Sequence, residues 1–183
     1  MTDLHSFVLA ALLHFAPPEH QDKRPWADPS RDYALARYSK VADAIVSACE
    51  SRKNPKACAS LLTAIAVGES AVSRDTDEGP CHRSGPWKRR CDGGRAVSVY
   101  QIHPTGADAD GPITAERLFA DRKLAARIAY RAAAGSLQMC RHLPDPVDHL
   151  SGLSGRCQAG LKSARERYKL WRKIAQFQIQ EKK

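Results

Sequence analysis

Several short signatures by which protein classes are recognised are absent from this chain of 183 residues. Neither the GxGxxG pattern nor a phosphate-binding loop of the GxxxxGK type occurs, which argues against a nucleotide-binding enzyme. No serine lies in a GxSxG elbow, so a Ser-His-Asp hydrolase is disfavoured. The cysteines include no CxxC pair, a spacing typical of zinc sites, and we expect neither a metal nor another cofactor.

Long apolar runs are missing as well. The main candidate, residues 7–16 (FVLAALLHFA), has only ten residues and contains His14, far short of a membrane span. No basic segment precedes it and no clear small-x-small cleavage site follows it, as both would in a secretory signal. We interpret it as a packed amphipathic helix, with a degenerate export signal as the alternative, and expect no stable membrane insertion.

Acidic residues are in the minority, with 20 Asp and Glu against 29 Lys and Arg and a net charge of +9. This excess favours a polyanionic partner through long-range attraction, and both an acidic bacterial wall and nucleic acid meet that description. The hydrophobic content of 43% is that of a globular protein. Four prolines in residues 17–30 divide the chain into an N-terminal helix and arm, residues 1–30, and a main domain, residues 31–183.

The six cysteines fall into three pairs that are close in the sequence. We predict the disulfides Cys49–Cys58, Cys81–Cys91 and Cys140–Cys157, each of which closes a short loop. Because disulfides persist in oxidising compartments, they indicate an extracytoplasmic protein, periplasmic or secreted. Buried free thiols in a cytosolic protein are the alternative.

Helical spacing of apolar residues predominates along the chain. It predicts helices over residues 32–50, from about residue 56 to Ser70, from Thr114 onward with a break near Asp121, and over residues 161–174. A short β-type run at residues 96–102 lies between the second and third of them. We therefore predict a mainly α fold of the α+β type, with a small β element beside the second helix.

One acidic residue lies on the apolar side of that second helix. Leu61, Ile65 and Glu69 are spaced at i, i+4 and i+8, which places the Glu69 carboxylate on the stripe that faces the core. Burial and the negative end of a helix dipole both favour the protonated form of a carboxyl group, and a protonated carboxyl can act as a general acid. A helix-terminal Glu that reaches solvent or pairs with an Arg is the alternative.

Two motifs, in this order, resemble the catalytic core of the lysozyme-like superfamily. The first is Glu69-Ser70 at a helix end, and the second, after Gly93-Gly94, is SVYQI at residues 98–102 followed by a proline. The branch most similar is that of soluble lytic transglycosylases and goose-type lysozymes, where the second motif is of the Gly-Leu-Met-Gln-Ile type. The tyrosine of that family's third motif is absent from residues 150–155, LSGLSG, where Ser151 or Ser154 is the candidate substitute and a plain loop is the alternative.

The resemblance implies that Glu69 is the catalytic acid and base. It also implies substrate contacts from Ser70, Ser98, Tyr100, Gln101 and Ser154. In a β strand, Tyr100 and Gln101 would point to opposite faces, and Gln101 is then the one expected to face the substrate. Trp87 and the basic residues 88–90 are candidates for a sugar-binding edge.

A hydrolase would need a second carboxylate, which the loop after Glu69 can provide. The candidates are Asp75, Asp77 and Asp92, and solvated loop charges are the alternative for Asp75 and Asp77. Inversion requires a separation of about 6.5–9.5 Å between the two carboxyl groups and retention about 5–5.5 Å. A transglycosylase needs no second carboxylate, because a hydroxyl group of the sugar replaces water.

The resemblance thus implies a peptidoglycan-cleaving enzyme, either a lytic transglycosylase or a muramidase, which cuts between N-acetylmuramic acid and N-acetylglucosamine. We expect a monomer whose partner is the glycan strand and not nucleic acid. Delivery by a phage would reconcile the cysteines with the missing export signal. A non-catalytic wall-binding or phage structural protein of the same fold is the alternative, followed by a basic helical protein that binds nucleic acid.

Overall fold

The computed structural model describes residues 3–21, 24, 26–79 and 91–178, and it is mainly helical. The longer helices in this part of the chain are α1 (Leu4–Phe15), α2 (Arg31–Cys49), α3 (Pro55–Ser70), α7 (Arg122–Met139) and α8 (Leu161–Ala175). Shorter helical segments are η1 (Pro18–Gln21), α4 (Arg74–Asp77), α6 (Ala115–Ala120) and η3 (Pro146–Ser154). The predicted fold class is therefore confirmed at the level of a mainly α protein.

Most helices begin at a residue whose side chain caps the first turn. Ser30, Asn54, Thr114 and Asp121 each accept a hydrogen bond from a backbone N–H three residues later. These bonds satisfy donors that the first turn of a helix otherwise leaves without a partner. The predicted start at Thr114 and the break at Asp121 are both confirmed, since Asp121 ends α6 and caps α7.

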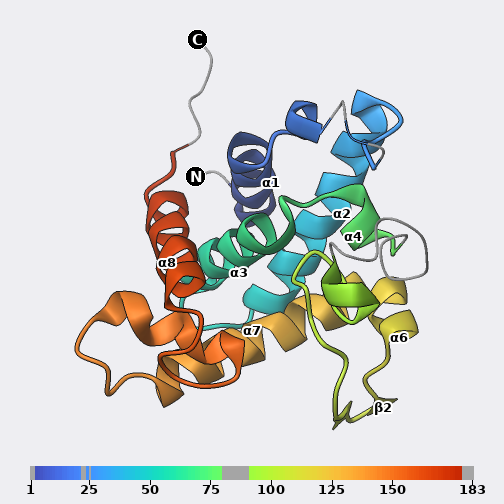
Figure 1. Cartoon of the computed structure of the whole chain (residues 1–183). Coiled ribbons are helices and arrows are strands. Elements are labelled where there is room, and N and C mark those ends of the chain that lie inside the picture. Colours follow the sequence, from blue (N-terminus) through green and yellow to red (C-terminus); the bar gives the residue numbers. More distant parts are fainter. Residues whose placement is uncertain (1–2, 22–23, 25, 80–90, 179–183) are drawn as a thin grey trace.

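Helix α3 lies in the middle of the molecule (Figure 1), in contact with α1, α2, α7 and α8. Its buried face includes Leu61, Leu62 and Ile65, each at most 3% exposed. Helix α1 adds Phe7 and Leu12 to the same core, so the predicted packed N-terminal helix is confirmed. Among the described residues, no helix is both long and apolar enough to cross a membrane.

The proline-rich residues 17–30 contact the main domain at two points. The Gln21 side chain donates a 2.8 Å hydrogen bond to the carbonyl oxygen of Ala71, just after α3. The Asp28 carboxylate accepts two hydrogen bonds, of 2.7 and 2.8 Å, from Arg37 on α2. This segment therefore helps to hold the C-terminal end of α3 in place.

The predicted β run at residues 96–102 is wrong. Val97 and Ile102 form one antiparallel bridge, but residues 98–101 between them are a tight turn. Ser98 and Gln101 adopt left-handed backbone angles, with φ of 64° and 50°, and this reverses the chain. The small sheet lies further along, where β1 (Ala107–Asp108) pairs with β2 (Gly111–Pro112) as a short hairpin.

Two of the three predicted disulfides are confirmed. Cys49 and Cys58 join the end of α2 to the start of α3, and Cys140 and Cys157 join the end of α7 to the segment before α8. The Cα atoms are 5.6 and 5.4 Å apart, within the usual range for a disulfide. Cys91 is also disulfide-bonded, while Cys81, its predicted partner, lies outside the described residues.

A buried ion-pair network joins α2, α4 and α7. The Asp77 carboxylate, 1% exposed, accepts hydrogen bonds of 2.9 and 3.0 Å from Arg122 and lies 3.5 Å from Arg37. Burial alone would lower the pKa of Arg37, but its hydrogen bonds to Asp28 and the nearby Asp77 charge raise that pKa above its ordinary value. Asp77 is thus a structural residue and not a solvated loop charge.

Replacing this carboxylate should leave Arg122 without the acceptor of its two hydrogen bonds and Arg37 with Asp28 as its remaining carboxylate partner. We expect Asp77→Ala to lower the free energy of unfolding by about 3–5 kcal/mol, the typical cost of breaking a buried ion pair from one side. Urea unfolding measures the loss as a lower midpoint. The matched variant is Asp148→Ala, which breaks the more exposed pair with Arg165 and should cost far less. Equal losses would contradict a structural role for the network.

Candidate active site

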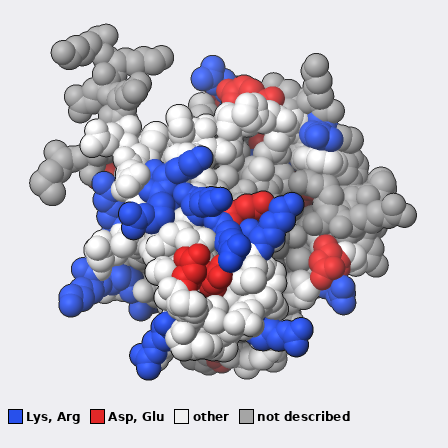
Figure 2. Space-filling view, turned by 60° about the vertical axis from the view of Figure 1, so that its left-hand side comes forward, with Lys and Arg blue, Asp and Glu red and all other residues white. Residues whose placement is uncertain are grey.

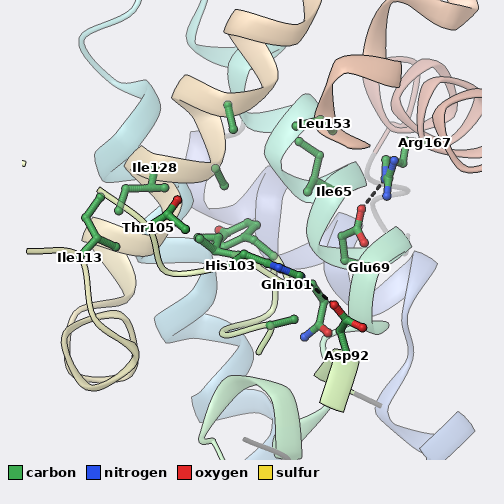
Figure 3. A pocket seen from close by; sticks show the side chains of 15 residues that line it. Ile65, Glu69, Asp92, Gln101, His103, Thr105, Ile113, Ile128, Leu153 and Arg167 are labelled. Atoms are coloured by element: carbon green, nitrogen blue, oxygen red, sulfur yellow. Dashed lines mark hydrogen bonds and ion pairs between the residues drawn. The ribbon is translucent and has the colours of Figure 1, made fainter. Parts of the chain in front are cut away.

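A cavity of about 600 Å³ lies beside the C-terminal half of α3. Its walls come from α3, α7, η3 and α8 on one side and from residues 92–105 on the other (Figure 3). The charged or ionisable side chains on its walls are Glu69, Arg167, Asp92, His103 and Tyr100. The volume is that of a small-molecule site and accommodates a short stretch of a polymeric ligand.

Glu69 is the second-last residue of α3 and points into this cavity (Figure 3). Its side chain is 20% exposed, so most of it is sheltered from water. The helix ends directly afterwards, because Ala71 and Val72 both adopt positive φ, 50° and 53°. The sequence thus predicted correctly that Glu69 would lie at the end of a helix and on its inward side.

Glu69 forms an ion pair with Arg167 of α8. Its Oε1 accepts a short hydrogen bond from the Arg167 Nε, and the Arg167 side chain is only 14% exposed. A guanidinium in contact favours the ionised form of a carboxyl group. The sequence left this possibility open as pairing with an unspecified Arg, but it did not identify Arg167, which is 98 residues away. No local pattern reports such a contact.

A second acidic residue lies on the other wall of the cavity. The Asp92 carboxylate is 3.2 Å from the His103 Nε2 and 3.1 Å from Arg95, and about half of the Asp92 and His103 side chains is exposed. Asp75 and Asp77, the other two predicted second carboxylates, are buried and do not line this cavity. Both lie in α4, which turns them inward, so Asp92 is the candidate that shares the cavity with Glu69.

Ser70 is a structural residue at the end of α3. Its hydroxyl group is hydrogen-bonded to the carbonyl oxygens of Val99, at 2.9 Å, and Ala66, at 3.0 Å, and accepts a hydrogen bond from the Val72 amide. The residue is 6% exposed and does not line the cavity. The structure therefore gives Ser70 no place on the wall of this cavity, where a substrate contact was expected. Ser70 instead links α3, the helix that contains Glu69, to the turn at residues 98–101.

Two further predicted substrate contacts also lie away from the cavity walls. Ser98 is 4% exposed, and its hydroxyl oxygen is 3.3 Å from the Tyr100 amide, a contact inside the turn. Ser154 is exposed at the end of η3, although its neighbour Leu153 does reach the cavity. A motif position in the sequence does not specify the direction of a side chain, so the resemblance could not place these two residues relative to the cavity.

Tyr100 and Gln101 both line the cavity, because the backbone turns here and the strict alternation of a strand does not apply. The Gln101 side chain donates a 3.2 Å hydrogen bond to the Ser98 carbonyl oxygen. Tyr100 is 6% exposed, and burial, followed by the Asp77 charge, raises the pKa of its phenol far above the ordinary value. Its hydroxyl group therefore stays neutral and can act only as a hydrogen-bonding group.

Among the described residues, no three His, Cys, Asp or Glu side chains are grouped as a metal site would require. The candidate sugar-binding edge at Trp87 and residues 88–90 lies outside the described residues. No family model, no curated protein and no solved structure matches this chain. The chemistry of the site must therefore be argued from its own residues.

The Ser70 hydroxyl group makes two hydrogen bonds outside its own helix, to Val99 and Val72. Their contribution to stability can be measured by comparing Ser70 with another buried serine of α3. Ser60 is also buried in α3, but its hydroxyl group bonds only to the Lys56 carbonyl one turn earlier. Ser70→Ala would leave the buried Val99 carbonyl without this partner and should cost about 1–3 kcal/mol. Ser60→Ala should cost much less, because helix backbone bonding continues without it. Equal urea midpoints for the two variants would contradict the assigned role.

Proposed function

We propose that this protein cleaves the glycosidic bond between N-acetylmuramic acid and N-acetylglucosamine in peptidoglycan, with Glu69 as general acid. The observation that carries the proposal is the position of Glu69, largely sheltered, at a helix end in the wall of a cavity that the Gln101 turn also lines. This agrees with the resemblance of Glu69-Ser70 and the Gln101-Ile102 pair to the lysozyme-like superfamily.

The first chemical step is the same for both variants of the reaction. Protonated Glu69 donates its proton to the glycosidic oxygen as the bond from that oxygen to C1 of the muramyl sugar breaks, which makes the leaving sugar a neutral alcohol. The resulting carboxylate then acts as a base. In a transglycosylase it takes the proton of the muramyl sugar's own hydroxyl group, which closes onto C1.

Hydrolysis would instead require water at C1 and a second carboxylate. Asp92, paired with His103 on the opposite wall, is the candidate for that role. Asp75 and Asp77 are not, because both are buried away from the cavity. Whether the protein is a transglycosylase or a muramidase therefore depends on whether Asp92 takes part in the reaction.

The surroundings of the site support a wall substrate. The net charge of +9 favours an acidic polymer, and the two disulfides of the described residues are compatible with an extracytoplasmic location. We propose that the protein acts as a monomer in the periplasm or outside the cell. The peptidoglycan strand is then its partner.

Glu69→Gln tests the proposal directly, since the amide keeps the shape of the side chain and cannot transfer the proton. We expect clearing of purified peptidoglycan to fall by at least about 100-fold, the usual contribution of a general acid. Glu166→Gln, at an exposed position of α8, is the matched control and should clear at the wild-type rate. Equal clearing by wild type and Glu69→Gln would remove Glu69 from the mechanism.

Mass spectrometry of the released fragments, combined with Asp92→Asn, decides between the two reactions. Transglycosylation yields anhydro-ended fragments, and activity should then survive Asp92→Asn within about threefold, because no water is activated. Hydrolysis yields reducing ends, and the same variant should lose at least about 100-fold. Reducing ends from a fully active Asp92→Asn enzyme would show that Asp92 is not the second carboxylate.

The Glu69–Arg167 ion pair supports one other function, a wall-binding protein without catalysis. In that case Glu69 would serve only to hold α8 against α3. Wild-type protein that binds purified walls in a pull-down but releases no fragments would favour this alternative.

A further inference from the structure

The proposed chemistry and the observed ion pair make opposite demands on Glu69. A general acid must carry a proton, whereas contact with a guanidinium favours the ionised carboxylate. Of the other charged groups on the cavity walls, Asp92 and His103 lie on the opposite side and contact each other. Among the described residues, Arg167 is therefore the charged group on the cavity walls that contacts Glu69.

The guanidinium of Arg167 is incompletely satisfied where it lies. Its Nη1 is buried and has no hydrogen-bond partner among the described residues. A buried donor without a partner costs free energy, so this pose is less stable than one in which an acceptor meets that nitrogen. The same side chain lines the cavity, and a small movement toward it would bring the guanidinium to a ligand.

The aliphatic part of the Arg167 side chain lies over α3 at Gly68, where a Cβ atom would be 3.6 Å from the Arg167 Cγ, an ordinary contact distance. Glycine at this position therefore leaves space between α3 and the side chain. The head group is bonded to α3 through the Arg167 Nε and Glu69.

We propose that Arg167 binds a carboxylate of the glycan ligand and thereby exchanges its ion pair with Glu69 for one with the ligand. The inference rests on the proposed function for the identity of the ligand. Once the guanidinium pairs with the ligand, the Glu69 carboxyl group is free of that contact and available to the glycosidic oxygen. Arg167 is thus a positioning residue for the reaction and a binding residue for an acidic group.

The chemistry of the substrate provides such a group. N-acetylmuramic acid differs from N-acetylglucosamine by a lactyl ether that ends in a carboxyl group, and in the wall this carboxyl is joined to a peptide that has carboxylates of its own. Arginine suits either source, because its planar fork of donors matches a carboxylate. A neutral polymer of N-acetylglucosamine alone offers no partner and should leave Glu69 in its ion pair.

The surface around α8 is suited to an anionic ligand. Figure 2 shows Lys and Arg side chains gathered across this face, with a few acidic side chains among them. The exposed basic residues of α8 are Lys162, Arg165, Lys169, Arg172 and Lys173. Their combined potential raises the local concentration of anions next to the helix that carries Arg167.

The test is calorimetric binding of three small ligands that lack the bond to be cleaved. The first is neutral N,N′-diacetylchitobiose, and the second is N-acetylglucosaminyl-N-acetylmuramic acid, which adds the lactyl carboxylate. The third carries an Ala-Glu dipeptide on that lactyl group, so its carboxylates lie on the peptide. Each is measured with wild type, Arg167→Gln, Arg167→Lys and Glu69→Gln.

We expect wild type to bind at least one acidic ligand about tenfold more tightly than chitobiose, as a charge-assisted hydrogen bond implies. The ligand that is preferred identifies the source of the carboxylate. Arg167→Gln should abolish the preference, and Arg167→Lys should restore part of it. Glu69→Gln should raise the preference for the acidic ligand over chitobiose several-fold relative to wild type, because no protein carboxylate competes for Arg167.

Three results would overturn the inference: no preference in wild type, an undiminished preference in Arg167→Gln, or no gain in Glu69→Gln. Failure of all ligands to bind would overturn it as well. Arg141→Gln, at an exposed position after α7 and outside the basic surface of α8, is the control and should behave as wild type, and thermal unfolding verifies that each variant is folded. Wall clearing without selectivity would refute this inference alone, whereas selectivity without clearing would refute the proposed reaction.

Discussion

The end of α3 is the constraint on which the rest of the site depends. The left-handed residues Ala71 and Val72 end the helix directly after Ser70, and the chain beyond them is held by the Ser70 hydroxyl group and by Gln21. The helix is packed against α1, α2, α7 and α8, and the cavity lies beside its last turns. Glu69 is the residue that points there. A carboxylate on so rigid an element keeps its position whether or not a ligand is present.

Around this fixed carboxylate, the charges of the cavity are arranged as two pairs on opposite walls. Glu69 and Arg167 join α3 to α8, while Asp92 and His103 belong to the segment between residues 91 and 105. The pairs differ in solvent exposure. The Glu69 and Arg167 side chains are 20% and 14% exposed, whereas the Asp92 and His103 side chains are about half exposed. Water screens the outer pair strongly and the inner pair weakly, so a change of partner at Glu69 has the larger electrostatic effect.

Buried charge elsewhere serves a different purpose. Asp77 holds α4 against α2 and α7 through Arg37 and Arg122, with all three carboxylate contacts inside the protein. This network fixes the segment that leaves α3 and so supports the wall of the cavity from behind. The described residues thus contain two different kinds of buried ion pair. The donors around Asp77 meet their acceptors, whereas the Arg167 guanidinium has one buried N–H donor without a partner. A buried donor without a partner calls for an explanation, and its place beside the cavity is the observation behind the proposed binding role of Arg167.

The sequence by itself determined the local features: the helices and their caps, the break at Asp121, two of the disulfides, and the inward position of Glu69 at a helix end. These follow from spacing and from residue types whose effect is confined to one turn of helix or one short loop. Only the tertiary structure decided that Arg167 meets Glu69, that Asp75 and Asp77 turn inward while Asp92 faces the cavity, and that residues 98–101 form a turn. The physical reason is that such contacts depend on how distant segments pack and on individual left-handed residues, and a periodic pattern records neither.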